Sequence, residues 1–357
     1  MRTRFVRVAL AALWLLLVPW LLLAALLGRS KRRINPQRIR VVLGATPLIN
    51  YSLWAKAIRT TGVHAETTTY GCYSINSRDD WDAVLPASLL RSWPSAAASL
   101  LRSLVTYDIL VTSFDGFLMR APLVWRLEAI FCRLAKQKTV IFPYGSDAYV
   151  YERVRSPHTL AGLQISYPQT GRRTESVRRR VVYWNQYADV VIPAGMGFDG
   201  FARADLLTPN SLCLDLDDFP ARKSSLSAMD NAPMNVFHSS NHDAIKGTHF
   251  LERAVARLNG EGLEINLRIA RGWPNRKVKE CLTSWAHVHV DQLIMNGYGM
   301  SAIEGMAAGV PVVANLQNTE DWKVFRRYSF LDECPIVSAD PETIEEVLRR
   351  LYFDLSL

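Results

Sequence analysis

The stretch from Gly297 to Val313 constrains the fold of this chain more than any other part of the sequence. Two glycines open it, and glycine lets a backbone pass close to a bulky neighbour. Apolar residues then recur at helical spacing from Ile303 onwards. Residues 310–314 are apolar and largely β-branched, which is typical of a strand covered on both faces. The order of loop, short helix and buried strand predicts one unit of a parallel α/β sheet.

One acidic residue, Glu304, lies in the first turns of this predicted helix. Its side chain would lean towards the helix N-terminus, where Gly297, Tyr298 and Gly299 carry the loop. Free backbone N–H groups there suit a phosphate, and a carboxylate suits sugar hydroxyls. The pattern therefore favours a nucleotide-sugar site over the alternative, in which Glu304 only complements the helix dipole.

The same residues resemble the donor-site signature of the retaining GT-B glycosyltransferases of family 4, also called group 1. That signature is a Glu, seven residues, a second Glu, a helix of small residues and a Pro-Val-Val-like strand. Glu304 falls on the second Glu, and Asn296 replaces the first. An amide keeps a donor and an acceptor but loses the charge. The resemblance implies that Glu304 fixes the ribose and that Asn296 faces the sugar hydroxyls.

A second motif of the same family is a lysine before a helix, and Lys246-Gly247 precedes an amphipathic segment here. A lysine binds a phosphate as a point charge. The family's arginine a few residues earlier is absent, because residues 240–242 are Ser, Asn and His. The resemblance implies that Lys246 acts in catalysis with the helix N-terminus at Gly299, by stabilising the leaving diphosphate without a metal or a cofactor. A solvated lysine in a turn is the alternative.

Strands alternate with helical segments through both halves of the chain, which favours open parallel α/β sheets. Ligands bind beyond the carboxyl ends of such strands. Gly44 follows the first predicted strand, and a Tyr-Gly-Ser-Asp loop from Tyr144 to Asp147 follows another. This loop resembles a His-Gly-Ser-Asp-like loop of some family 4 members, with Tyr144 in place of the His. We expect a catalytic role for Asp147 and substrate contacts for Gly44 and Tyr144, unless the loop is an ordinary turn.

The N-terminal region contains 20 uncharged residues from Val8 to Leu27, enough to span a bilayer. The run is long, lacks an A-x-A-like cleavage site and is followed at once by basic residues, which indicates an uncleaved anchor rather than a signal peptide. The more basic flank after the run places the main domain in the cytoplasm. We therefore expect a single-pass anchor over 1–34, an N-terminal Rossmann-like acceptor domain over 35–220, a polar linker over 221–233 and a donor-binding Rossmann-like domain over 234–357.

The amino-acid composition limits the classes of molecule that the protein is expected to bind. The net charge of +9 favours an anionic surface or substrate, but no nucleic-acid motif occurs, so no nucleic-acid partner is expected. The five cysteines are scattered without a C-x-x-C, which argues against a disulfide framework and for a reducing compartment. Two other motifs compete with the main interpretation. Residues 195–200 fit the dinucleotide pattern G-x-G-x-x-G, and Asp215-Leu216-Asp217 fits a metal-binding D-x-D.

The expected fold is GT-B: two Rossmann-like domains facing a cleft, with one N-terminal transmembrane helix. The expected function is retaining, metal-independent transfer of a sugar from a nucleotide diphosphate sugar to a glycan or lipid-linked acceptor at the membrane. It would be hexosyltransferase-like and serve polysaccharide or envelope synthesis. Two alternatives stay open. The chain could bind a nucleotide sugar without turnover, since Asn296 and Tyr144 replace family residues, or it could be an NAD-dependent oxidoreductase that uses residues 195–200.

Overall fold

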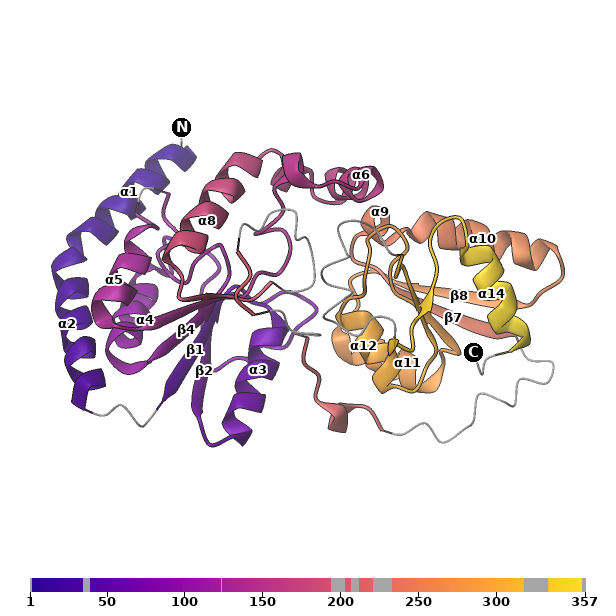
Figure 1. The fold of residues 1–357 in the computed structure, drawn as a ribbon, viewed down its shortest axis with the longest axis horizontal. Coiled ribbons are helices and arrows are strands. Elements are labelled where there is room, and N and C mark those ends of the chain that lie inside the picture. Colours follow the sequence, from indigo (N-terminus) through magenta and orange to yellow (C-terminus); the bar gives the residue numbers. More distant parts are fainter. Residues whose placement is uncertain are drawn as a thin grey trace. The chain divides into compact units, whose positions relative to one another are not determined.

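The computed structural model describes residues 2–34, 39–122, 124–193, 203–206, 212–220, 233–317 and 333–354. They form two compact units (Figure 1). The first contains the chain up to Ala148, residues 175–193 and residues 203–206. The second contains residues 149–174 and the described residues from Leu212 onwards. The dinucleotide-like motif at 195–200 and residues 221–232 of the expected linker lie outside the described residues.

The sheet of the first unit is parallel throughout, with the strand order β3-β2-β1-β4-β5-β6. Its strands are β1 (Arg40–Ala45), β2 (His64–Tyr70), β3 (Ala83–Leu85), β4 (Ile109–Thr112), β5 (Lys138–Ile141) and β6 (Val190–Val191). The register pairs Val41 with both Ala65 and Ile109, which places β1 in the interior of the sheet. From β1 to β3 strands are added on one side of β1, and from β4 to β6 on the other. This is the doubly wound arrangement, and it agrees with the alternating pattern of strands and helices in the sequence.

Helices cover both faces of this sheet because successive side chains of a strand point to opposite sides. Val41 and Leu43 pack with α3 (Ile49–Thr60), whereas Val42 packs with α4 (Trp93–Thr106) and α5 (Leu127–Ala135). Figure 1 shows α3 on one side of β1 and β2, with α4 and α5 on the other. Helix α8 (Thr174–Tyr187) contributes Val181 and Trp184 to a further apolar cluster.

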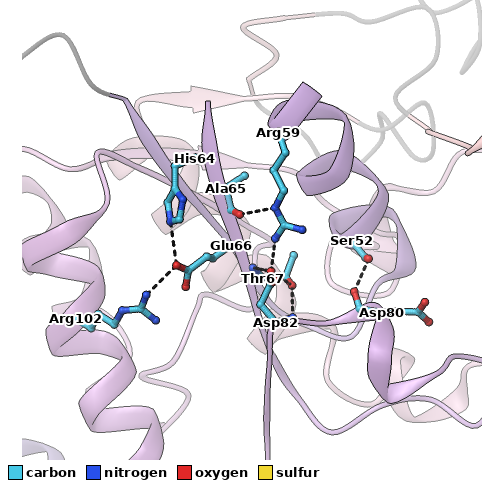
Figure 2. Close-up of polar contacts among 9 residues, drawn as sticks. All are labelled: Ser52, Arg59, His64, Ala65, Glu66, Thr67, Asp80, Asp82 and Arg102. Atoms are coloured by element: carbon cyan, nitrogen blue, oxygen red, sulfur yellow. Dashed lines mark hydrogen bonds and ion pairs between the residues drawn. The ribbon is translucent and has the colours of Figure 1, made fainter. Parts of the chain in front are cut away.

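Charged side chains help to hold the starting end of β2 (Figure 2). Asp82 accepts hydrogen bonds from the backbone N–H and the hydroxyl of Thr67, at 2.8 and 2.9 Å, and pairs with Arg59. Glu66 pairs with Arg102 of α4 at 2.8 Å. Asp82 and Glu66 are thus both paired, and they lie at the end of the sheet opposite to the one where ligands bind in parallel folds.

The N-terminal segment forms two helices, α1 (Arg2–Leu16) and α2 (Val18–Ile34). Among the described residues no single helix is long and apolar enough to cross a membrane, although the two together reach that length with a bend of 49°. The prediction of one transmembrane helix is therefore not confirmed. Pro19 explains the break, because proline lacks an N–H and fits only the first turn of a helix.

The second unit has a five-stranded parallel sheet with the order β11-β10-β9-β7-β8. Its strands are β7 (Met234–Ser239), β8 (Ile265–Ala270), β9 (Val288–Val290), β10 (Val312–Ala314) and β11 (Val337–Ser338). Val236 packs with α10 (Thr248–Gly260) and α14 (Ile344–Phe353) on one face, whereas Phe237 packs with α11 (Asn275–Ser284) on the other. Helix α12 (Met300–Ala307) precedes β10, which confirms the predicted loop, helix and strand.

Candidate functional site

The best-defined cluster of polar groups lies where β7 and β9 end and α12 begins. Asp291 follows β9 directly and is fully buried. One of its carboxylate oxygens pairs with the amino group of Lys246, and the other accepts the backbone N–H of Gly299 at 2.7 Å. The side chain of Lys246 keeps 20% of its surface exposed. The structure thus brings together the two groups predicted to bind phosphate, and Asp291, which sequence reasoning missed, joins them.

The electrostatics of this triad keep Asp291 ionised. Burial alone would raise the pKa of its carboxyl, but the charge of Lys246 and the Gly299 N–H outweigh it and hold the pKa below its ordinary value. A buried carboxylate is tolerated only when it is paired and hydrogen-bonded in this way. The alternative for Lys246 was a solvated lysine in a turn. That alternative does not fit the structure, because the amino group of Lys246 contacts a fully buried carboxylate.

The backbone around Lys246 is fixed by a close approach of two loops. Gly247 has φ +75°, and a Cβ at this position would lie 2.9 Å from the Cβ of Leu293. The carbonyl of Lys246 accepts the N–H of Leu293 at 3.0 Å. Glycine at 247 therefore lets the chain turn from α9 (Asp243–Lys246) into α10 against the segment that follows β9.

Two buried histidines support this edge of the sheet. His238 contacts the carbonyl of Val290 at 2.7 Å and the hydroxyl of Thr248 at 2.9 Å. His289 contacts the hydroxyl of Ser301, in the first turn of α12, at 2.7 Å. Burial lowers the pKa of each imidazole to about 4. Both are therefore neutral near pH 7, where they act as hydrogen-bonding supports for α10 and α12.

Glu304 lies on α12 and is 6% exposed. Its carboxylate accepts a hydrogen bond from the side-chain amide of Asn275 at 2.7 Å. Burial raises the pKa of Glu304, and the bond from Asn275 opposes that shift. Helix α12 packs closely on the sheet because position 305 is glycine: a Cβ there would lie 2.8 Å from Val312 and 3.0 Å from His289. Glu304 and the Gly299 N–H are thus carried by one tightly held helix.

The loop before α12 is fixed by side-chain amides. Asn296 is buried and donates to the side-chain oxygen of Asn315 at 3.2 Å and to the carbonyl of Gln317 at 3.3 Å. The N–H of Gly297 is bonded to the carbonyl of Asn315 at 2.7 Å, and Tyr298 packs against an apolar cluster around Ala302. These contacts tie the loop to the end of β10. A sugar contact from Asn296 stays a prediction.

An open hollow of about 410 Å³ lies beside this cluster, at the ends of β7 and β8. Its lining comes from α6 (Pro157–Ser166), from the residues that follow β7 and from the turn after β8. Arg271 pairs with Asp243 across it at 2.8 Å, and His242 packs on the ring of Tyr167 with centroids 4.2 Å apart. Trp273, which follows this turn, packs against Phe237 and carries Lys277 over its ring at 3.9 Å.

The candidates of the first unit lie at the ends of β1 and β5. Asp147 is 3% exposed and accepts backbone N–H groups from Phe114, Tyr144 and Gly145 at 3.0, 2.9 and 3.0 Å. Burial, with a smaller effect of Asp115, raises the pKa of Asp147 from 3.8 to about 7. All these bonds go to backbone, so Asp147 fastens the loop on which Tyr144 lies, and its catalytic role stays a prediction.

Two other residues near this loop, Asp115 and Arg180, were not assigned to the site from the sequence. The hydroxyl of Tyr144 donates to Asp115 at 2.8 Å, and Arg180 pairs with the same carboxylate at 3.2 Å. Arg180 belongs to a basic run in the sequence, yet only 19% of its side chain is exposed. Gly44 needs no ligand to explain it, since a Cβ there would lie 2.0 Å from the carbonyl oxygen of Thr68 in β2.

The D-x-D motif has a local role in the structure. The carboxylate of Asp215 accepts the N–H of Asp217 at 3.3 Å and caps the short turn η4 (Leu216–Asp218). Both aspartates are exposed. In the part of the chain that the structure describes, no three His, Cys, Asp or Glu side chains are grouped so that they could hold a metal ion.

The chain is similar to several solved structures. An alpha-glucosyltransferase in complex with UDP and a 13-mer DNA containing a central A:G mismatch aligns over 89% of this chain and 91% of its own, with a TM-score of 0.55 and 12% identity. The chain has the fold of the GT-B glycosyltransferases. A sucrose-phosphate synthase from Thermosynechococcus elongatus aligns over 89% of this chain and 90% of its own, with a TM-score of 0.46 and 14% identity. A spinosyn rhamnosyltransferase aligns over 88% and 92%, with a TM-score of 0.41 and 11% identity.

The resemblance inferred from Glu304 and Lys246 is thus confirmed for the fold. No protein-family model and no curated protein sequence matches the chain. At this level of identity the likeness concerns the fold of the GT-B class, and the chemistry has to be argued from the residues.

Proposed function

We propose that the protein is a glycosyltransferase that moves a sugar from a nucleotide diphosphate sugar to a glycan or lipid-linked acceptor. One observation carries the proposal: the Asp291 carboxylate holds Lys246 and the Gly299 N–H at the same place, at the ligand-binding edge of a parallel sheet. A cation and a helix N-terminus form a phosphate site. Glu304, on the same helix, adds the carboxylate that a ribose requires.

These groups suit a leaving diphosphate. When the bond from the anomeric carbon to the diphosphate breaks, negative charge develops on the departing oxygens. Lys246 and the positive end of the α12 dipole, which begins at Gly299, would stabilise that charge without a metal ion. Lysine carries three donors, so it can keep its bond to Asp291 while it binds a phosphate oxygen. Asp291 would then act as the positioning residue for the lysine.

The finer features of the reaction follow from the family resemblance. We assign retention of configuration to the transfer, ribose binding to Glu304 and sugar contacts to Asn296. The first unit would bind the acceptor through Gly44 and Tyr144, with Asp147 at the reacting end. The basic N-terminal segment would hold the enzyme at a membrane, where an envelope glycan or a lipid-linked acceptor is available.

The direct test is binding and turnover with a panel of nucleotide sugars. We expect one member to bind and to be hydrolysed slowly without acceptor, and Lys246→Ala to weaken both. Lys138→Ala is the matched control, since Lys138 forms an exposed pair with Asp189 in the first unit. If no nucleotide sugar binds, the proposal fails. Binding without turnover would favour the non-catalytic alternative, and binding of NAD(P) alone would favour the oxidoreductase.

A further inference from the structure

Helices α1 and α2 bury one stripe of side chains against the first unit. Leu10, Trp14, Leu21 and Ala25 recur at helical spacing and are at most 4% exposed. They belong to the same apolar cluster as the inner faces of α4 and α5. The ring of Trp14 meets that of Trp93 edge-on, with centroids 6.2 Å apart. One half of the segment is therefore part of the core of the unit.

The end of α2 is fitted to α4 and α5 in detail. A Cβ at Gly28 would lie 2.0 Å from the carbonyl oxygen of Leu104, so glycine lets α2 approach α4 closely. One turn later, Arg32 donates to the carbonyls of Leu104, at 3.0 Å, and Ala135, at 2.6 Å. It also pairs with Asp108 at 3.3 Å. Arg32 thus satisfies carbonyls at the C-terminal ends of two helices, which would otherwise lack partners.

This fit opposes a crossing of the bilayer by the segment. A helix that left the unit to span a membrane would uncover the apolar stripe and would leave the helix-end carbonyls and Asp108 without Arg32. The bend of 49° between α1 and α2 also follows the surface of the unit rather than one straight axis (Figure 1).

The opposite side of the same two helices is apolar and exposed. Its large side chains are between 40 and 77% exposed: Phe5, Val8, Leu15, Leu16, Trp20, Leu22, Leu23, Leu26 and Leu27. We call these residues the outer face. A helix on the surface of a soluble protein has polar residues on its outward side, and contiguous apolar patches mark an interaction site. The outer face therefore requires a partner.

The charges around the outer face indicate which partner it is. Seven basic residues flank the uncharged run, and the first acidic residue of the chain is Glu66. The basic residues are Arg2, Arg4, Arg7, Arg29, Lys31, Arg32 and Arg33. Because Arg32 is bonded to Asp108 and to the helix-end carbonyls, the charges counted towards a partner are the other six. A second copy of the chain would bring a second basic segment against the first, which disfavours pairing. A surface with anionic headgroups above an apolar layer matches both the arginines and the leucines.

We propose that α1 and α2 attach the first unit to an anionic membrane in the plane of the interface, with the outer face in the lipid and without crossing it. Both this proposal and the proposed function place the protein at a membrane. The attachment of α1 and α2 to lipid does not depend on whether the protein transfers a sugar. It replaces the single-pass anchor expected from hydropathy. Under this arrangement the N-terminus and both units lie on the same side of the bilayer.

Topology is the first test. The full chain is expressed with an epitope at each end, and sealed membrane vesicles are treated with protease. We expect both epitopes to be cleaved, or both protected, according to which side of the vesicle faces out. Protection of one epitope and cleavage of the other would overturn the proposal in favour of a spanning helix.

Lipid binding is the second test. The purified protein should float with vesicles that contain phosphatidylglycerol, float less with pure phosphatidylcholine, and lose binding in high salt. Leu16→Glu combined with Leu23→Glu should reduce the floated fraction at least tenfold while the circular dichroism and the melting temperature stay unchanged. Ile165→Glu is the matched control, because Ile165 is 70% exposed but lies in the second unit. The proposal would be contradicted if the double variant floated as well as the unchanged protein. It would also be contradicted if the unchanged protein bound no lipid but formed a dimer that the double variant abolished.

Discussion

One oxygen of the Asp291 carboxylate accepts a hydrogen bond from the amino group of Lys246, although Lys246 ends α9 and Asp291 follows β9. The acid is fully buried, and the lysine is partly exposed. The carboxylate of Asp291 has no access to solvent, whereas the ammonium of Lys246 can still reach a ligand. This difference in exposure is what we expect if Asp291 positions Lys246 and Lys246 binds the ligand.

Replacement of Asp291 tests whether it positions the lysine. Asp291→Asn keeps an acceptor for the Gly299 N–H but removes the negative charge that pairs with the ammonium of Lys246. A hydrogen bond to a charged group contributes about 1.5–3 kcal/mol, so we expect kcat/KM for sugar transfer to fall about tenfold or more. The double variant with Lys246→Ala should be no worse than Lys246→Ala alone, because the two residues act as one unit. Additive losses would show that Asp291 acts independently of the lysine.

Replacement of Glu304 tests donor binding. Glu304→Gln removes a charge-assisted hydrogen bond to the donor, so we expect the affinity to fall by about 1.5–3 kcal/mol in calorimetry. The fold should persist, since glutamine can still accept the bond from Asn275. Glu345→Gln is the matched control, because Glu345, on α14, forms a surface pair with Arg257 of α10, away from α12. Unchanged affinity in Glu304→Gln would remove this residue from the site.

The sequence predicted the frame of the site because local pattern determines it. The glycines, the apolar spacing and the β-branched run after Gly297 led to α12 and β10. The pairing of Asp291 with Lys246 and Gly299 depends on how the end of α9, the end of β9 and the start of α12 meet in space, and no local sequence pattern encodes those distances. Asn296 shows the same limit, since its bonds to Asn315 and Gln317 depend on how the loop folds back on β10.

The N-terminal segment shows a different limit. Hydropathy measures how apolar the run from Val8 to Leu27 is, but it does not tell whether protein or lipid covers each side. The small residues on the buried side, such as Ala11, Ala25 and Gly28, carry a helical spacing that indicates close packing. That spacing was the available signal for a segment that belongs partly to the core.

Arg32 should be important for the stability of the first unit. Arg32→Met keeps the aliphatic packing but removes the donor to carbonyls at the ends of α4 and α5 and the charge that pairs with Asp108. We expect a loss of about 1.5–3 kcal/mol in the free energy of unfolding by denaturant. Arg102→Met is the control: its pair with Glu66 is exposed (Figure 2), so it should cost about 1 kcal/mol or less. Equal losses in the two variants would contradict the role given to Arg32.

Asp147 should make the stability of the first unit depend on pH. Its pKa is raised from 3.8 to about 7 in the folded protein, so the folded state holds a proton that the unfolded state has released. The stability that comes from this proton is complete below pH 3.8 and is lost as the pH rises to about 7, at no more than about 1.4 kcal/mol per pH unit. Asp147→Asn should remove this slope from the denaturation midpoints. A slope that persists in the variant would assign the pH dependence to another group.

Chelation of metal ions distinguishes two ways to stabilise the leaving diphosphate. One uses a divalent cation held by a D-x-D, and the other uses a helix N-terminus and a basic side chain. Asp215 caps its own turn, and Asp217 points its backbone N–H at that cap. Lys246 and Gly299 meet at Asp291 instead. We therefore expect sugar transfer to continue in excess EDTA and Asp217→Ala to leave donor affinity unchanged. Loss of transfer with EDTA and its recovery with manganese would move the diphosphate site to Asp215 and Asp217.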